Sequence, residues 1–278
     1  MGLFGKLFEK KECAICGGEI GLLGNRKLED GNMCKACAAK LSPWFDERRH
    51  STVAQIEEQL EYRESNKENV AAFRTTLSLG ETAKVLLDEY VGRFMVTSAR
   101  NYSEANPDVL ELSDITGCTY DIDEGIDEVT RFDENNEAVS YDPPRFTHSY
   151  NFYVTVYVNN PYFDDMRFKV NSRTVEVEER RGPAVSANPG SINLVIGSLS
   201  GAETFNPEAS VEYCTYRDLC ERIVATLLEN RQSAREEIAA AAAPKAAVAC
   251  PYCGATTTPT TTNCCEFCGG ALGDWASR

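Results

Sequence analysis

Alternation of apolar and polar residues predicts that the middle of the chain is rich in β-strands. The clearest run is 150–158, where every second residue from Tyr150 to Val158 is aromatic or β-branched. Further strands are expected at 84–88, 93–98, 115–123, 167–170, 174–177 and 192–196, with a turn at Gly92 between the first two. Stretches rich in polar residues, Pro and Asn predict loops at 101–108, 133–145 and 180–210.

Two segments have the period of a helix instead. Thr52 and Gln55 fit a capping box, and the helix that they start is expected to run to about Phe73 with a highly charged, solvated surface. A second helix is predicted to begin with a Thr215-x-x-Asp218 cap. Its apolar stripe comprises Tyr216, Leu219, Cys220, Ile223, Val224, Leu227 and Leu228.

These elements predict an α+β chain of several domains. The apolar stripe of the last helix needs a sheet to cover, so the strands and this helix are expected to form one β-rich domain over 80–232. A small barrel or sandwich closed by the C-terminal helix, as in pleckstrin-homology-like domains, would satisfy this pattern. The charged helix would be a connector over 51–76. The Ala-rich stretch 233–249, interrupted by Pro244, would be a linker.

Cysteines give the strongest chemical signal. Eight of the twelve form four Cys-x-x-Cys pairs, two near each end of the chain. A structural zinc site needs four soft ligands in a tetrahedron, and two such pairs supply them. We therefore expect two structural Zn²⁺ ions, held in small ribbons at 1–45 and 250–272. The expected ligands are Cys13, Cys16, Cys34 and Cys37 in the first ribbon, and Cys250, Cys253, Cys265 and Cys268 in the second.

Glycines next to the pairs support the zinc interpretation. Gly17, Gly254 and Gly269 each follow the second cysteine of a pair. Glycine tolerates the left-handed backbone that lets amides point at the sulfurs. The pair that ends at Cys37 is followed by Ala38 instead.

Some alternatives stay open for the metal sites. Cys264 adjoins Cys265 and would be able to replace it, although only Cys265 gives the two-residue spacing to Cys268. A rubredoxin-like iron site and redox-active dithiols are the competing chemistries. No thioredoxin-like βαβ pattern accompanies the pairs, which favours zinc over dithiols.

No pattern typical of an enzyme appears. The two histidines, His50 and His148, are not part of a His-Glu-x-x-His motif, and His148 is expected in a loop or at a strand edge. There is no P-loop, dinucleotide fingerprint or nucleophile elbow. Cys118 and Cys220 lie on apolar faces and are expected in the core. We therefore expect a protein without catalytic activity.

The formal net charge of −15 is concentrated in the middle of the chain. Residues 51–244 hold 34 acidic and 17 basic residues, whereas residues 1–50 hold 7 and 9. The carboxylates at 121–128 do not align with the glycine and terminal glutamate of an EF-hand calcium loop, so they predict an acidic surface. The acidic middle of the chain repels nucleic acid and anionic lipid, so the N-terminal ribbon is the part expected to bind either of them. Its candidate contacts are Arg26, Lys27, Lys35, Lys40, Arg48 and Arg49.

The beginning of the chain bears on localisation. Leu3, Phe4, Leu7 and Phe8 lie at helical spacing with lysines alongside, so residues 1–11 would be a short interfacial helix or simply a frayed tail. Two turns are too few for firm membrane anchoring. No signal peptide and no long apolar run is present, so a cytoplasmic protein is expected.

The N-terminal ribbon contains the motifs Cys13-Ala-Ile-Cys-Gly-Gly-Glu-Ile, Asp30-Gly, Cys34-Lys-Ala-Cys and Lys40-Leu-Ser-Pro. With these motifs it resembles a bacterial zinc-binding domain of unknown function. Similar segments continue to about residue 178, among them Asn106-Pro-Asp and Asn160-Pro-Tyr-Phe. The C-terminal ribbon is similar to the zinc-ribbon tails of many bacterial proteins. This resemblance implies a bacterial, cytoplasmic zinc protein and brings no known activity.

Three functions are compatible with these features. Two closed metal sites without a catalytic pattern favour a non-enzymatic adaptor or scaffold that binds an unknown protein partner. The basic residues of the N-terminal ribbon allow a nucleic-acid-associated regulator, although the acidic middle disfavours nucleic acid. A membrane-surface adaptor through residues 1–11 is disfavoured for the same electrostatic reason.

Overall fold

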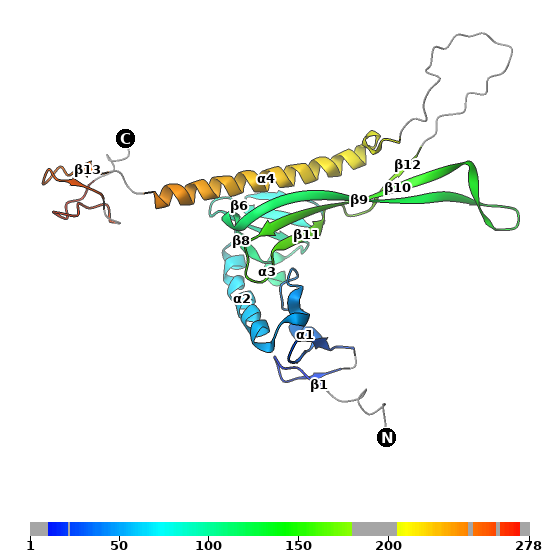
Figure 1. Ribbon diagram of the computed structural model, residues 1–278, viewed down its shortest axis with the longest axis horizontal. Coiled ribbons are helices and arrows are strands. Elements are labelled where there is room, and N and C mark those ends of the chain that lie inside the picture. Colours follow the sequence, from blue (N-terminus) through cyan, green and yellow to red (C-terminus); the bar gives the residue numbers. More distant parts are fainter. Residues whose placement is uncertain (1–10, 22, 180–204, 244–246, 260–261, 273–278) are drawn as a thin grey trace, which may run out of the picture. The chain divides into compact units, whose positions relative to one another are not determined.

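The computed structural model describes residues 11–21, 23–179, 205–243, 247–259 and 262–272. The chain divides into two compact units, Met1–Gln232 and Ser233–Arg278. It is a mixed α/β protein with a β-rich middle, a C-terminal helix and a cluster of four cysteines near each end (Figure 1). No helix in the described part of the chain is both long and apolar enough to cross a bilayer.

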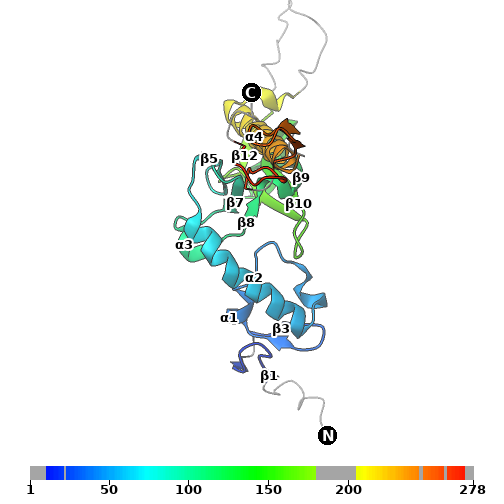
Figure 2. The same ribbon diagram turned by 90° about the vertical axis from the view of Figure 1, so that its left-hand side faces the viewer.

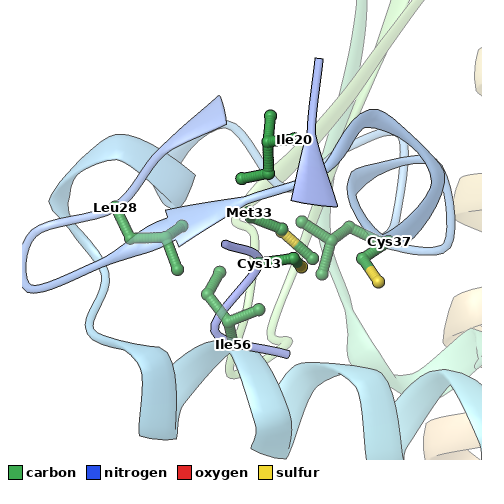
Figure 3. Close-up of a cluster of buried hydrophobic side chains, with 7 residues drawn as sticks. Cys13, Ile20, Leu28, Met33, Cys37 and Ile56 are labelled. Atoms are coloured by element: carbon green, nitrogen blue, oxygen red, sulfur yellow. The ribbon is translucent and has the colours of Figure 1, made fainter. Parts of the chain in front are cut away.

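The N-terminal ribbon consists of two short hairpins and one helical turn. Strand β1 (Lys11–Glu12) pairs with β2 (Glu19–Ile20), and β3 (Arg26–Lys27) pairs with β4 (Asn32–Met33). Helix α1 (Lys35–Ala38) and the 3-10 turn η2 (Glu47–His50) follow. So small a ribbon has little core of its own. Figure 3 shows how Ile56, from the next helix, completes a buried cluster with Leu28, Met33 and one cysteine of each pair, Cys13 and Cys37.

That next helix is α2 (Val53–Ala72), and its capping box is confirmed. The Thr52 hydroxyl accepts from the Gln55 N–H at 3.3 Å, and the Gln55 side chain accepts from the Thr52 N–H at 2.9 Å. The solvated connector surface expected for the rest of this helix is wrong in part. Gln59, Arg63 and Asn66 are buried, because α2 runs from the ribbon to the first sheet of the middle domain (Figures 1 and 2).

A buried polar cluster joins α2 to both of its neighbours. Arg63 Nη1 donates to Asp108 Oδ1 at 2.7 Å, and the Ser42 hydroxyl donates to the other oxygen of Asp108 at 2.8 Å. Asn66 donates to the Pro107 carbonyl at 2.7 Å and accepts from the Val109 N–H at 3.0 Å. The partners lie more than 40 positions apart in sequence, so local patterns did not reveal this cluster.

The first sheet has the order β5-β6-β7-β8 and is antiparallel throughout. Its strands are β5 (Leu77–Leu79), β6 (Lys84–Asp88), β7 (Arg93–Thr97) and β8 (Val109–Glu111). The two strands predicted around Gly92 are confirmed, and this glycine has a φ of +69° in the turn. The predicted loop at 101–108 contains one helical turn, α3 (Tyr102–Ala105), and a 3-10 turn, η3 (Leu112–Asp114), follows β8.

The second sheet is built on a long hairpin, drawn in green in Figure 1. Strand β9 (Ile115–Phe132) pairs along its length with β10 (Ala138–Val158), with a register shift between Ser140 and Arg145. On its other side β10 pairs with β11 (Asp165–Lys169) and β12 (Val175–Glu178). The predicted loop at 133–145 is therefore wrong from Ala138 onward. The part of this hairpin between the predicted strands 115–123 and 150–158 is the distal hairpin. Most of its side chains are at least partly exposed, so apolar alternation, the signal for a half-buried strand, is absent there.

The last helix, α4, spans Val211–Ala242 and follows the 3-10 turn η4 (Pro207–Ala209). The predicted cap at Thr215 is wrong: its hydroxyl donates to the Val211 carbonyl inside the helix at 2.7 Å, and Ser210 Oγ instead accepts from the Tyr213 N–H. The apolar stripe is confirmed, with Tyr216, Cys220, Ile223 and Leu227 buried. Tyr213 and Tyr216 contact Phe152 of β10. Helix α4 also continues through most of the predicted linker, since alanine is the best helix former.

Some expectations cannot be compared with the structure. The strand expected at 192–196 and nearly all of the 1–11 segment lie outside the described residues. The likeness to a pleckstrin-homology domain stays a prediction.

Candidate metal centres

Four cysteine sulfurs converge in the N-terminal ribbon. The Sγ atoms of Cys13, Cys16, Cys34 and Cys37 all lie within 4.8 Å of one another. All four are free thiols, and the sulfurs of Cys16 and Cys34 are 3.9 Å apart. That separation is far beyond a disulfide bond of about 2 Å.

The first pair sits in a tight turn between β1 and β2. The Cys13 N–H donates to the Gly18 carbonyl and the Gly17 N–H donates to the Cys13 carbonyl, both at 2.8 Å. Gly17 has a φ of +69°, the left-handed conformation that the sequence predicted for it. This turn directs both thiols of the pair to one side.

The second pair uses a different device, which explains why it needs no glycine. Cys34 is the N-cap of α1, and its sulfur accepts from the Cys37 N–H at 3.3 Å. Since Cys37 lies within the first helical turn, Ala38 follows in helical conformation and not in the left-handed one. The Cys34 N–H in turn donates to Cys13 Sγ at 3.2 Å, which ties the two pairs together.

The C-terminal ribbon repeats the glycine turn twice. The Cys250 N–H donates to the Ala255 carbonyl at 2.9 Å, and the Cys265 N–H donates to the Gly270 carbonyl at 2.8 Å. The glycines that follow each pair have positive φ, +73° at 254 and +71° at 269. Strands β13 (Val248–Ala249) and β14 (Thr256–Thr257) flank the first turn.

These turns bring the second group of four sulfurs together. The Sγ atoms of Cys250, Cys253, Cys265 and Cys268 lie within 4.8 Å of one another. Cys264 is not part of this group: its backbone forms an isolated β-bridge with Ala271, and its thiol donates to the Thr262 carbonyl at 3.5 Å. The structure therefore brings together the same eight cysteines that the sequence analysis predicted, with Cys265 and not Cys264 in the second group.

The sulfur separations fit a tetrahedral metal ion. Four thiolates about 2.3 Å from a central zinc are about 3.8 Å from one another. The separations are 3.6 Å for Cys250–Cys268, 3.8 Å for Cys253–Cys265 and 3.9 Å for Cys16–Cys34. Each group could therefore bind one metal ion with four protein ligands, consistent with zinc, and leave no coordination position for water or substrate.

A comparison with protein families gives a match over the segment that holds the first of these centres. Residues 11–59 match the family model DUF4428, a domain of unknown function. The DUF4428 segment covers the whole N-terminal ribbon and the first two turns of α2, which is also the extent of the buried cluster in Figure 3. Neither the curated proteins nor the solved structures gave a match.

The thiols of the two metal centres differ in acidity. Burial disfavours the thiolate of Cys13, but backbone N–H groups of Cys34, Cys16 and Ile15 prevail and lower its pKa to about 6. Burial and the neighbouring thiols raise the pKa of Cys37 to about 12. In the C-terminal centre, burial disfavours the Cys265 thiolate, but N–H groups of Cys268 and Phe267 stabilise it, and its pKa falls to about 6. Four crowded thiolates need a bound cation to be stable together.

The remaining cysteines are placed away from the metal centres. Cys118 on β9 and Cys220 on α4 are buried, as predicted, and burial raises the pKa of each thiol to about 12. Cys214 is partly buried, and its thiol donates to the Glu208 carbonyl at 3.2 Å. The raised pKa makes the thiols of Cys118 and Cys220 poor nucleophiles and poor metal ligands.

One polar constellation was missed by sequence reasoning. His148 is not in a loop or at a strand edge: it lies on β10 between β9 and β12. Its Nδ1 lies 2.8 Å from a Glu124 carboxylate oxygen, to which the Tyr150 hydroxyl also donates at 2.8 Å. The hydrogen bonds from His148 and Tyr150 hold the pKa of Glu124 below its usual range. Phe205 stacks on the imidazole, with ring centroids 3.7 Å apart.

Proposed function

We propose that this protein is a non-enzymatic, cytoplasmic zinc-binding adaptor that holds a protein partner. The observation that carries the proposal is the coordination geometry. Both metal centres offer four thiolates, and a structural zinc site with four protein ligands has no open position for catalysis. Bound zinc would supply folding energy to the ribbons and fix the loops around them.

The C-terminal ribbon supplies a surface for such a partner. Tyr252 and Phe267 occupy the same position in the two glycine turns, directly before the second cysteine. Their side chains are 71 % and 68 % exposed, respectively. Aromatic residues held on a rigid frame are typical anchors of protein interfaces. Glu266 is the only charged residue between 247 and 272, so a nucleic acid would find no cation on this segment.

A second candidate is a nucleic-acid-associated regulator that uses the N-terminal ribbon. The observation in its favour is a group of basic side chains on β3 and η2. The 34 acidic residues between 51 and 244 weigh against it, because they repel the phosphate backbone. A membrane role for residues 1–11 stays a prediction.

Affinity capture from the native cell tests the adaptor function. The tagged full-length protein should retain a defined protein partner, and the double variant Tyr252→Ala/Phe267→Ala should lose it. The matched control is Tyr90→Ala/Phe132→Ala, which removes two aromatic side chains that are 88 % and 72 % exposed elsewhere. Failure of the wild-type protein to enrich any partner above an untagged control would contradict the proposal.

A further inference from the structure

The fold brings together two pairs of basic residues that lie 22 positions apart in sequence. Arg26 and Lys27 form β3, and Arg48 and Arg49 lie in η2. Arg48 Nη1 donates to the Lys27 carbonyl at 2.7 Å, which fixes η2 against β3. We call these four residues the basic patch.

The backbone beneath the basic patch is anchored. Leu28, next to the patch, is fully buried in the cluster of Figure 3. The Glu29 N–H donates to the Ser51 carbonyl at 3.0 Å, and the Ser51 hydroxyl donates to the Glu47 carbonyl at 2.9 Å. The positions from which the four side chains extend are therefore set before a ligand binds, which lowers the entropic cost of binding.

The basic patch has no ion-pair partner among the described residues, although Glu29, Asp30, Asp46 and Glu47 adjoin it in sequence. Four other arginines have carboxylate partners: Arg63 pairs with Asp108, Arg93 with Glu111, Arg167 with Asp121, and Arg217 with Glu208. Burial and the charges of Arg26 and Arg49 lower the pKa of Arg48, as expected where like charges are crowded. Nearby Asp30 instead caps α2, accepting from the Val53 N–H at 2.8 Å.

We propose that the basic patch binds a short acidic segment of a protein partner. Guanidinium groups match carboxylates in geometry and charge, and a cluster of them binds acidic motifs through several charge-assisted hydrogen bonds. A short segment places its charge at one point. A nucleic acid has a long line of phosphates, which a protein with net charge −15 repels beyond the patch. The inference rests on the proposed adaptor function and names one of its binding surfaces.

The test is fluorescence anisotropy with a labelled oligoglutamate peptide and the zinc-loaded full-length protein at physiological ionic strength. The variant is Arg26→Gln/Lys27→Gln/Arg49→Gln, which keeps Arg48 and its hydrogen bond to β3. The control, Arg100→Gln/Arg173→Gln/Arg222→Gln, removes the same charge from exposed positions of the middle domain. A labelled single-stranded oligonucleotide with the same number of charges is the competing probe.

The wild-type protein and the control should bind the peptide, and the patch variant should bind it about tenfold more weakly, since three exposed ion pairs are lost. Absence of peptide binding, or equal binding by both variants, would overturn the proposal. Tighter binding of the oligonucleotide than of the peptide would overturn it in favour of a nucleic-acid partner. Each of these failures leaves the affinity-capture result untouched, so the adaptor function is judged separately.

Discussion

At the residue scale, the two ways of shaping a Cys-x-x-Cys turn account for which pairs carry a glycine. Three pairs are followed by a glycine with φ near +70°, and the fourth begins helix α1 and is followed by Ala38. An L-residue in the left-handed conformation costs roughly 1–2 kcal/mol. A glycine after the second cysteine is therefore favoured only where the chain turns back at that point.

This difference gives a prediction for zinc affinity. Gly254→Ala should weaken zinc binding at the C-terminal centre by about tenfold, because the strain of about 1.4 kcal/mol is present only in the folded turn. An added Cβ meets no atom within 4 Å, so steric contact is not the cause. Competition with a chelating dye measures the change. Gly21→Ala, whose Cβ also meets nothing and whose φ is not positive, is the control and should leave affinity unchanged.

Arg63 and Asp108 give a second prediction. Both side chains are buried, so Arg63→Met leaves an unpaired carboxylate and should lower the free energy of unfolding by about 3–5 kcal/mol. Arg93→Met removes a partly exposed pair with Glu111 and should cost about 1 kcal/mol or less. Urea denaturation of the zinc-loaded proteins compares the two. Equal losses would show that the Arg63–Asp108 pair has no special role.

The two kinds of residue also differ in how well the sequence reveals them. The eight clustered cysteines were predictable because metal ligands recur at fixed local spacing. Arg63 and Asp108 were not, because they lie 45 positions apart and each looks like an ordinary surface residue in its own segment. His148 was misplaced for the same reason: its partners Glu124 and Phe205 come from other parts of the chain.

At the element scale, α2 contributes to two separate hydrophobic clusters. Its first turns complete the core of the DUF4428 ribbon with Val53, Ile56 and Leu60, and its last turn packs Val70 and Phe73 on the first sheet. The sequence predicted the helix and its cap, but not this double role, because its charged residues hide the buried positions. The distal hairpin of β9 and β10 was missed because its strands are held by pairing and not by an apolar face.

The role of α2 predicts how far the loss of metal spreads. Chelation should remove hydrogen-exchange protection from 13–37 and also from the first turns of α2, 53–60, because their core contains two of the ligands, Cys13 and Cys37. Strand β10 at 150–158 should keep its protection, since its buried contacts include Tyr213 and Tyr216 of α4 and neither metal centre. Equal loss at 150–158 would show that the middle domain depends on the metal.

At the scale of the whole molecule, charge and metal are distributed differently. The acidic residues are concentrated between the two cysteine clusters, and the basic patch lies on the N-terminal ribbon. This distribution follows directly from the sequence. Which basic residues meet in space required the fold, because β3 and η2 are brought together through buried Leu28 and Ser51.

The distribution predicts weak association with DNA. Duplex DNA should bind with at most low affinity at physiological salt, and raising the salt should abolish it, because the acidic residues between 51 and 244 repel the duplex and leave the cations of the N-terminal ribbon to displace counterions. Fluorescence anisotropy over a salt series measures this. Submicromolar binding that survives added salt would contradict the adaptor function and favour a regulator.

The central claim is that each cysteine cluster holds one structural zinc ion. Native mass spectrometry of the full-length protein, purified without chelator and paired with elemental analysis, tests it most directly. The expected result is two zinc ions per chain, falling to one in Cys16→Ser and in Cys253→Ser, since each variant breaks a single group of four. Fewer than two metal ions in the wild-type protein, or iron in place of zinc, would contradict the claim.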